Sequence, residues 1–272
     1  VDPRILVAAD IASADRVFRI GGAQAIAAMA FGTREVPRVD IVCGPGNLFV
    51  TMAKKLVYGE VGIDGLYGPT ETIIIADENA NPTLCAADLL AQSEHDELAT
   101  PVLITTSEAL AEHVRREIEV RIKRLEREAI ASASIDLRGC IAIVANIGDA
   151  ITLANEFAPE HLSLMVRDAE SYIQAVRNAG IVFVGEFSHE VLGDYVAGPS
   201  HVMPTGGTAR FSSGVNVRSF LRFIPIVNLN RETASKITGP ASVIGRSEGL
   251  TGHAEAAEIR HEISANVSQM EQ

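Results

Sequence analysis

The sequence has no long apolar run, few basic residues and only three cysteines. Its strongest apolar run, Ile73-Ile74-Ile75-Ala76, is far shorter than the ~20 residues that span a bilayer. Lysine and arginine total 23 against 35 aspartates and glutamates, which gives a net charge of −12. Nucleic acids and anionic membranes both bind basic surfaces. We therefore expect neither a membrane protein nor a nucleic-acid-binding protein.

The cysteines and the N-terminus bound the compartment and the extent of the chain. Cys43, Cys85 and Cys140 are odd in number, widely spaced and form no CxxC motif. This pattern argues against a disulfide framework and favours a reducing, cytoplasmic location. Residues 1–4 contain neither an apolar signal-peptide segment nor an initiator methionine. We expect the sequence to be a fragment or a trimmed form of a longer chain.

The residues that are present suit a large α/β protein. Apolar residues make up 47% of the 272 residues, enough to bury a sizeable core. Strand-like and helix-like patterns alternate along the chain, which predicts right-handed crossovers and mainly parallel sheets. The predicted strands are 16–20, 40–43, 71–76, 102–105, 141–144, 162–166 and 181–184. Four helices are predicted: one that ends at 31, one over 48–58, one that starts at 82 and one over about 107–130. The last is long, amphipathic and charged on one face.

The pattern changes after residue 186. A long loop rich in Gly, Pro, Ser and His covers 186–207, and loops of this length are usually functional. The last fifty or so residues look helical, with an interruption expected at Pro240. The expected fold is therefore α/β, with two Rossmann-like parallel-sheet domains, one of them incomplete, and a small helical C-terminal tail domain. The expected domains are 1–71, 72–215 and 216–272.

Two glycine-rich turns, at 21–24 and 44–47, are candidate phosphate sites. Backbone can approach an anion closely at such a turn, and the N-terminus of the following helix favours it. Neither turn matches the dinucleotide fingerprint G-x-G-x-x-G, so from the turns alone tight packing is the favoured interpretation. Cys43 precedes the second turn. It could act as a thiol nucleophile, but a small buried hydrophobe is the favoured interpretation.

Several polar residues have the chemistry of a metal or acid/base site. Gln92 and His95 are three residues apart, which places them on one helical face if the helix continues. On spacing alone, a capping or surface role is the favoured interpretation of His95. Glu160 and His161 join a helix to a strand, at the sheet edge where open α/β folds place their sites, and could transfer two protons or form an exposed pair. Asp194 could be a metal ligand or start an Asx-turn.

Seven blocks across nearly the whole chain resemble one family, histidinol dehydrogenase. They are GGAQAIAAMAFG (21–32), DIVCGPGNLFV (40–50), YGPTETIIIAD (67–77), DLLAQSEHD (88–96), FAPEHL (157–162), LGDYVAGPSHVMPTGG (192–207) and EGLTGH (248–253). The resemblance implies a zinc-dependent enzyme that oxidises L-histidinol to L-histidine through histidinal with two NAD⁺, the last steps of histidine biosynthesis. It also implies a homodimer in which the helical tail is exchanged between subunits.

The resemblance also assigns roles to positions in this chain. It implies NAD contacts for Gln24 and Asn47; zinc ligation by Gln92, His95, Asp194 and His253; an acid/base pair in Glu160 and His161; and substrate contacts for these zinc ligands, His161, Thr70 and Glu248. Two features depart from the family. Thr70 replaces the more common serine but keeps the hydroxyl, and roughly the first third of the family's chain is absent. The alternatives are a dehydrogenase of another small polar alcohol or an inactive truncated paralogue.

Overall fold

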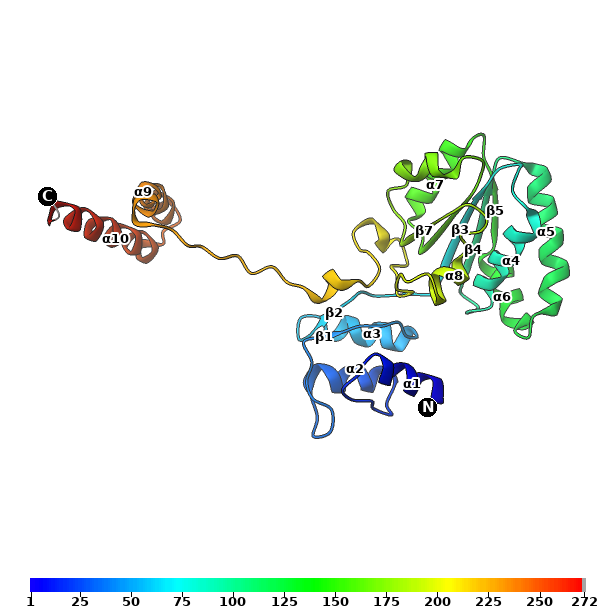
Figure 1. Ribbon diagram of the computed structural model, residues 1–272, viewed down its shortest axis with the longest axis horizontal. Helices are drawn as coiled ribbons and strands as arrows, with labels where there is room; N and C mark the ends of the chain where they lie inside the picture. Colours follow the sequence, from blue (N-terminus) through cyan, green and yellow to red (C-terminus); the bar gives the residue numbers. More distant parts are fainter. Residues whose placement is uncertain (271–272) are drawn as a thin grey trace. The chain divides into compact units, whose positions relative to one another are not determined.

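The computed structural model describes residues 1–270, and the chain divides into two units, Val1–Leu221 and Arg222–Gln272. The first unit contains both sheets, and the second contains two helices (Figure 1). The elements of the first unit up to the second sheet are α1 (Pro3–Ile11), α2 (Gly22–Phe31), β1 (Ile41–Val42), α3 (Leu48–Val57) and β2 (Gly62–Ile63). Strands β1 and β2 form a two-stranded parallel sheet.

The larger sheet has five parallel strands in the order β5-β4-β3-β6-β7. Its elements are β3 (Glu71–Ala76), α4 (Pro82–Ser93), β4 (Thr100–Thr105), α5 (Glu108–Arg121), η1 (Ile122–Arg124), α6 (Glu128–Arg138), β5 (Cys140–Ile143), α7 (Ile147–Phe157), β6 (His161–Met165), η2 (Ala169–Ala175) and β7 (Ile181–Val184). After it come α8 (Glu190–Tyr195), η3 (Thr208–Arg210) and η4 (Val217–Phe220), and the second unit holds α9 (Arg231–Ser247) and α10 (Thr251–Met270). The α/β class with parallel sheets and a helical C-terminal unit is confirmed.

The central strand β3 is covered on both faces, which explains its continuous apolar run. Ile73 and Ile75 belong to the core on the α7 side, while Ile74 and Ala76 pack with α4 and α5 on the other (Figure 1). Strands covered on both faces are continuous apolar runs rather than alternating ones. Asn81 caps α4 by accepting a hydrogen bond from the Thr83 backbone N–H, with Pro82 at the first helical position, as its sequence indicates.

Three local expectations are wrong. Residues 16–20 form no strand; they are exposed, and no neighbouring strand supplies the hydrogen bonds that a strand needs. The long helix expected over 107–130 is broken, because Leu125 is extended and α6 then packs against α4 and β4. Pro240 does not interrupt α9, since packing between α9 and α10 outweighs the single helical hydrogen bond that proline removes.

The loop over 186–207 contains a short helix that the sequence did not reveal. Helix α8 carries Glu190 at its first turn and Asp194 at its end, so Asp194 lies in a helix rather than in an Asx-turn. Gly193 permits this packing. A Cβ atom at that position would lie 2.5 Å from Cε1 of Phe183 on β7, so only glycine allows α8 to approach β7 this closely.

Within residues 1–270, no helix is both long enough and apolar enough to cross a bilayer.

Candidate functional site

The expected acid/base pair lies at the amino end of the larger sheet, not at the carboxyl end. His161 is the first residue of β6, where it is paired with Thr72 of β3 and Ile181 of β7. The carboxyl end between β3 and β6 is closed by Asp77, which accepts hydrogen bonds from the backbone N–H groups of Asn79 at 2.9 Å and Arg167 at 2.7 Å. Asp77 therefore links the segments that follow β3 and β6 at the end where open parallel sheets usually place their sites.

Glu160 and His161 are buried rather than exposed as a loop pair. Their exposed fractions are 7% and 3%. Glu160 Oε2 accepts hydrogen bonds from the Thr70 hydroxyl at 2.6 Å and from the Glu71 backbone N–H at 3.2 Å, both at the start of β3. The start of β3 thus fixes the Glu160 carboxylate. Thr70, which was expected to contact substrate, contacts Glu160 in this structure.

The imidazole of His161 is surrounded by carboxylates. Nδ1 lies 3.8 Å from Glu160 Oε2 and 3.8 Å from Glu190 Oε2, and Nε2 lies 3.6 Å from Asp194 Oδ1. The Phe183 ring packs beside it, with 6.0 Å between ring centroids. Neither ring nitrogen, nor Asp194 Oδ1, has a hydrogen-bond partner among the described residues. These buried atoms are positioned for a ligand that supplies positive charge or donors.

Electrostatics supports the same conclusion. Burial raises the pKa of Glu71 and that of Glu190 to about 7 each, and it raises the pKa of Glu160. Burial alone would lower the pKa of His161, but its contact with Asp194 and the charges of Glu190 and Glu160 raise it to about 9. A group of desolvated carboxylates around one imidazole favours a cation, because positive charge stabilises their ionised forms.

Helix α4 brings Gln92 to this cluster, but it does not carry His95. The helix ends at Ser93, so the two residues do not share a helical face. Gln92 is fully buried and its amide contacts Thr70 and Glu190, whereas His95 is exposed beyond the helix. Because α4 runs back along the sheet after β3, its last turn returns to the amino end where Glu160 and His161 lie.

A cleft of about 420 Å³ opens beside the cluster and brings together residues that flank both sheets. Asn47, Thr70 and His95 line it, together with the Gly68-Pro69 segment. Asn47 also caps α3 by accepting a hydrogen bond from the Val50 N–H at 3.1 Å. Gln24 is exposed in the first turn of α2 and is not among the residues that line this cleft.

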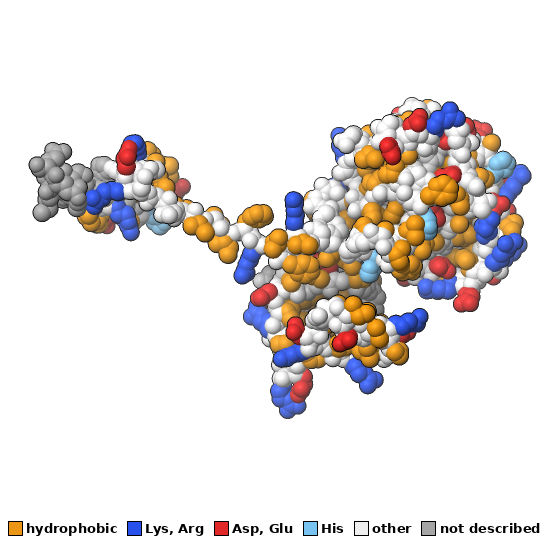
Figure 2. Space-filling view, in the orientation of Figure 1, with side chains coloured by type: hydrophobic (Ala, Val, Ile, Leu, Met, Phe, Trp, Pro, Cys, Tyr) orange, Lys and Arg blue, Asp and Glu red, His pale blue; other side chains and the backbone are white. Residues whose placement is uncertain are grey.

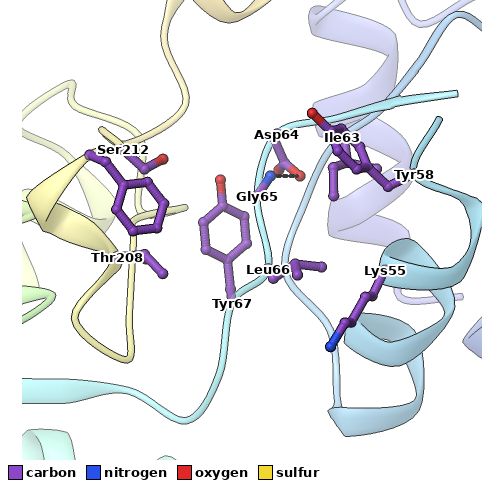
Figure 3. A pocket seen from close by; sticks show the side chains of 10 residues that line it. Lys55, Tyr58, Ile63, Asp64, Gly65, Leu66, Tyr67, Thr208 and Ser212 are labelled. Atoms are coloured by element: carbon purple, nitrogen blue, oxygen red, sulfur yellow. Dashed lines mark hydrogen bonds between the residues drawn. The ribbon is translucent and has the colours of Figure 1, made fainter.

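A second cavity, of about 310 Å³, lies on the other side of Tyr67. Figure 3 shows the Tyr67 ring between the side chains of Thr208 and Ser212 and those of the Asp64–Leu66 segment. The Tyr67 hydroxyl is buried without a hydrogen-bond partner in the described chain, and burial raises its pKa. None of the residues expected to bind NAD, zinc or substrate lines this cavity.

The remaining expected residues lie elsewhere. Glu248 and His253 are exposed in the second unit, Glu248 at the end of α9 and His253 in the first turn of α10. Cys43 is exposed rather than buried, and desolvation together with Asp64 raises the pKa of its thiol, which disfavours a thiolate nucleophile. Sequence reasoning missed Glu190, although an acidic residue four positions before Asp194 was a usable signal for one helical face.

The expected zinc ligands fit a cation by their chemistry. Among the described side chains, no three His, Cys, Asp or Glu residues are clustered to hold a metal. Of the four expected zinc ligands, His95, Asp194 and the amide of Gln92 belong to the first unit. The unpartnered Oδ1 of Asp194 and the surplus of carboxylates suit a divalent ion.

Comparison with known proteins identifies one family in sequence and in structure. A family model described as histidinol dehydrogenase matches residues 1–261. Histidinol dehydrogenases of Dehalococcoides mccartyi and Thermus thermophilus are 52% and 51% identical, over 94% and 96% of this chain. The crystal structure of histidinol dehydrogenase from Elizabethkingia anophelis superimposes with a TM-score of 0.91 at 36% identity, covering 96% of this chain and 60% of that one.

The chain spans about three-fifths of the length of these relatives, covering 59% of the Dehalococcoides protein and 63% of the Thermus protein. The match nevertheless includes every residue that forms the buried cluster at the amino ends of β3 and β6. On this basis the chain belongs to the histidinol dehydrogenase family.

Proposed function

We propose that this chain carries the zinc and acid/base centre of a histidinol dehydrogenase, which oxidises L-histidinol to L-histidine through histidinal with two NAD⁺. The observation that carries the proposal is the contact of the buried Glu160 and His161 with the partly buried Asp194, beside a cleft lined by Thr70 and His95. A cytoplasmic location is part of the proposal, since histidine biosynthesis is an intracellular process.

The charge of the site supports an amine-bearing substrate. Glu71, Glu160, Glu190 and Asp194 gather around one imidazole. Such a cluster attracts cations and repels anionic alcohols, because opposite charges interact strongly where water is largely excluded. L-Histidinol carries an ammonium group and an imidazole and no carboxylate, so it complements this cluster better than a hydroxy acid does.

Each part of the chain has a role in the proposal. Residues 1–71 would bind NAD. Gln24 and Asn47 lie at the N-termini of α2 and α3, and helix N-termini favour the phosphates of a cofactor. Residues 72–215 hold the zinc ligands Gln92, His95 and Asp194 with the acid/base pair. Residues 216–272 form the tail that supplies His253 and Glu248.

The chemistry follows from the two buried acid/base groups. Zinc, when bound, supplies a Lewis acid that polarises the substrate oxygen. A cation bound at Asp194 would offset the carboxylate charges that raise the pKa of His161, so the imidazole would be neutral and free to act as a base. In the first oxidation His161 would take the hydroxyl proton while the substrate carbon loses a hydride to NAD⁺, which leaves the aldehyde. Glu160 then takes a proton from water as the water oxygen bonds to the aldehyde carbon, and His161 returns its proton to the aldehyde oxygen, which gives the hydrate and leaves His161 neutral again. Hydride transfer from this hydrate to a second NAD⁺, with His161 removing the proton, yields the carboxylic acid.

The acid/base roles are tested by assaying histidinol and histidinal separately. We expect His161→Asn to slow both oxidations by ~10²–10⁴-fold. Glu160→Gln should slow histidinal oxidation more than histidinol oxidation, because only the second step needs activated water. Equal losses on both substrates for Glu160→Gln would assign Glu160 another role. NADH formation with other small alcohols but not with histidinol would favour the alternative dehydrogenase, and no NADH formation with any of them would favour an inactive paralogue.

We further propose a homodimer in which the tail completes the partner's site. Figure 2 shows hydrophobic side chains along the segment that precedes α9, and Phe223, Ile226 and Val227 are 100%, 87% and 83% exposed. An apolar extended segment of this kind is stabilised by packing against another protein surface. An exchange of tails is reciprocal in a dimer with two-fold symmetry.

Mixed dimers test the exchange. A His253→Ala chain and an Asp194→Ala chain should each be nearly inactive alone. In a heterodimer, one site combines Asp194 of the His253→Ala chain with His253 of the Asp194→Ala chain and is intact, while the other site lacks both. About half of the wild-type activity should therefore return. Purified heterodimers as inactive as their parents would show that His253 acts within its own subunit.

A further inference from the structure

Glu190 is buried beside the proposed zinc ligands but has no role in the scheme above. It is 2% exposed, at the first residue of α8. Its Oε2 accepts a hydrogen bond from the Thr72 hydroxyl on β3 and lies 3.8 Å from His161 Nδ1. Its Oε1 is in contact with the amide of Gln92. A carboxylate held between β3, α4 and β6 in this way constrains the orientation of the groups that donate hydrogen bonds to it.

Glu190 and the Glu71 backbone N–H both suit one orientation of the Gln92 amide and not the other. With its nitrogen toward Glu190, it donates to Oε1 and, at 3.2 Å, to Oε2. Its oxygen then accepts from the Glu71 backbone N–H at 3.2 Å and lies against the Thr70 hydroxyl, whose single hydrogen goes either to this oxygen or to Glu160 Oε2. The opposite orientation would set the amide oxygen against a carboxylate oxygen and the amide nitrogen against an N–H group. Glu190 therefore decides which end of the amide faces which side.

The orientation matters because only one end of an amide binds a metal. The oxygen has lone pairs, whereas the NH₂ group donates hydrogen bonds and has none available. In the orientation that Glu190 requires, the oxygen lies on the side of Thr70, and Thr70 lines the cleft. Groups behind a metal ligand commonly fix its orientation in this way.

We propose that Glu190 is a positioning residue that turns the Gln92 amide so that its oxygen, not its nitrogen, faces the zinc position. This inference rests on the proposed function, in which Gln92 is a zinc ligand. Thr72 serves the same purpose indirectly, by holding the Glu190 carboxylate in place.

The test exchanges the two groups. In Glu190→Gln, the new amide can donate to the Gln92 oxygen, so the Gln92 nitrogen turns toward the metal. Zinc affinity should fall by ~10–100-fold. In the double variant Gln92→Glu with Glu190→Gln, one oxygen of the carboxylate introduced on α4 accepts from the amide introduced on α8, while its other oxygen is available to zinc. Affinity should return to within about threefold of the unaltered protein.

The measurement is the zinc dissociation constant of the full-length protein, obtained by competition with a chromogenic chelator. Thermal melting of the zinc-free proteins checks that each variant is folded. Glu170→Gln is the matched control, because it also converts a glutamate to an amide but at an exposed position on η2. It should leave zinc affinity unchanged.

The outcomes separate this proposal from the one on which it rests. If the unaltered protein binds no zinc, the proposed zinc site is wrong, and the role of Glu190 fails with it. If the unaltered protein binds zinc and Glu190→Gln binds it equally well, only the role of Glu190 is overturned. The same holds if the folded double variant stays as weak as Glu190→Gln. Rescue by the exchange supports the proposal, since a residue with a merely structural role would not be compensated by a change at Gln92.

Discussion

Lys54 and Asp64 form an ion pair whose side chains are only 2% and 0% exposed. Lys54 Nζ also donates to the carbonyl of Gly44 at 3.0 Å, and Asp64 Oδ2 accepts from the Gly44 N–H at 2.7 Å. The ammonium group lies 4.9 Å from the centroid of the Tyr67 ring. The pair therefore holds the glycine-rich turn before α3 from both sides.

Removing one partner of this pair should destabilise the protein strongly. We expect Lys54→Met to cost about 3–5 kcal/mol in the free energy of unfolding, because it leaves Asp64 charged and buried without compensation. Lys55→Met, at the exposed neighbouring position, should change it by less than about 0.5 kcal/mol. Urea denaturation measures both. Lys54→Met with Asp64→Asn should be less damaging than Lys54→Met alone, and equal stability of the two single variants would refute the role of the pair.

The close approach of α8 to β7 makes a second prediction. In Gly193→Ala the new methyl group would lie 2.5 Å and 2.8 Å from two Phe183 ring atoms. Helix α8 must then move outward, which carries Asp194 away from His161. We expect a loss of about 1–3 kcal/mol in stability and weaker zinc binding. Adding Phe183→Leu makes room for the methyl group and should recover part of both. A Gly193→Ala protein with wild-type stability and zinc affinity would contradict this packing.

Asp88 on α4 predicts a pH dependence of stability. Burial raises its pKa from 3.8 to about 6, although His189 opposes the shift, and its Oδ2 is buried without a partner in the described chain. The folded state therefore binds the proton more tightly than the unfolded state. Stability from this group is present below pH 4, falls as the pH rises from about 4 to 6, and stays lower above that range.

Asp88→Asn should remove this loss. Because Asp88 is partly exposed, we expect a gain of only about 1 kcal/mol at pH 7, or ~2–4 °C in Tm, and little difference at pH 4. Melting curves across this range measure the effect. Asp10→Asn, at an exposed position on α1, should show no such pH-dependent gain. A constant difference between Asp88→Asn and the unaltered protein at every pH would show that ionisation of Asp88 is not the cause.

The three cysteines should react in two classes. Cys85 is 0% exposed, and burial raises its pKa to about 12, whereas Cys43 and Cys140 are exposed. Thiolate is the reactive form, so a disulfide reagent added to the native protein should titrate two thiols. The Cys85 thiol should react only after denaturation, and this third thiol should be missing from the titration of Cys85→Ser. Immediate reaction of three thiols in the native protein would contradict the burial of Cys85.

Much of the fold could be predicted from local sequence. The apolar run at 73–76 indicates a buried strand, which was predicted over 71–76, and β3 has those bounds. Asn81 and Pro82 mark the start of α4, where the structure begins the helix. These signals succeed because hydrophobic continuity, capping and proline geometry act within a few residues of each other. The blocks around Gln92, Glu160 and Asp194 likewise indicate the family that the comparisons show.

The tertiary structure alone decided which of these residues meet, and at which end of the sheet. The apolar pattern at 16–20 predicts a strand, but a strand forms only where a partner is present, and that is not a local property. Helix α8 is six residues long, so the spacing between Glu190 and Asp194 was its one local signal, and the Gly- and Pro-rich sequence around it predicts a loop. Glu160, Gln92 and Glu190 come from separate segments that meet only after β3, α4 and β6 have packed, because proximity between distant segments is set by burial of the shared core rather than by sequence spacing.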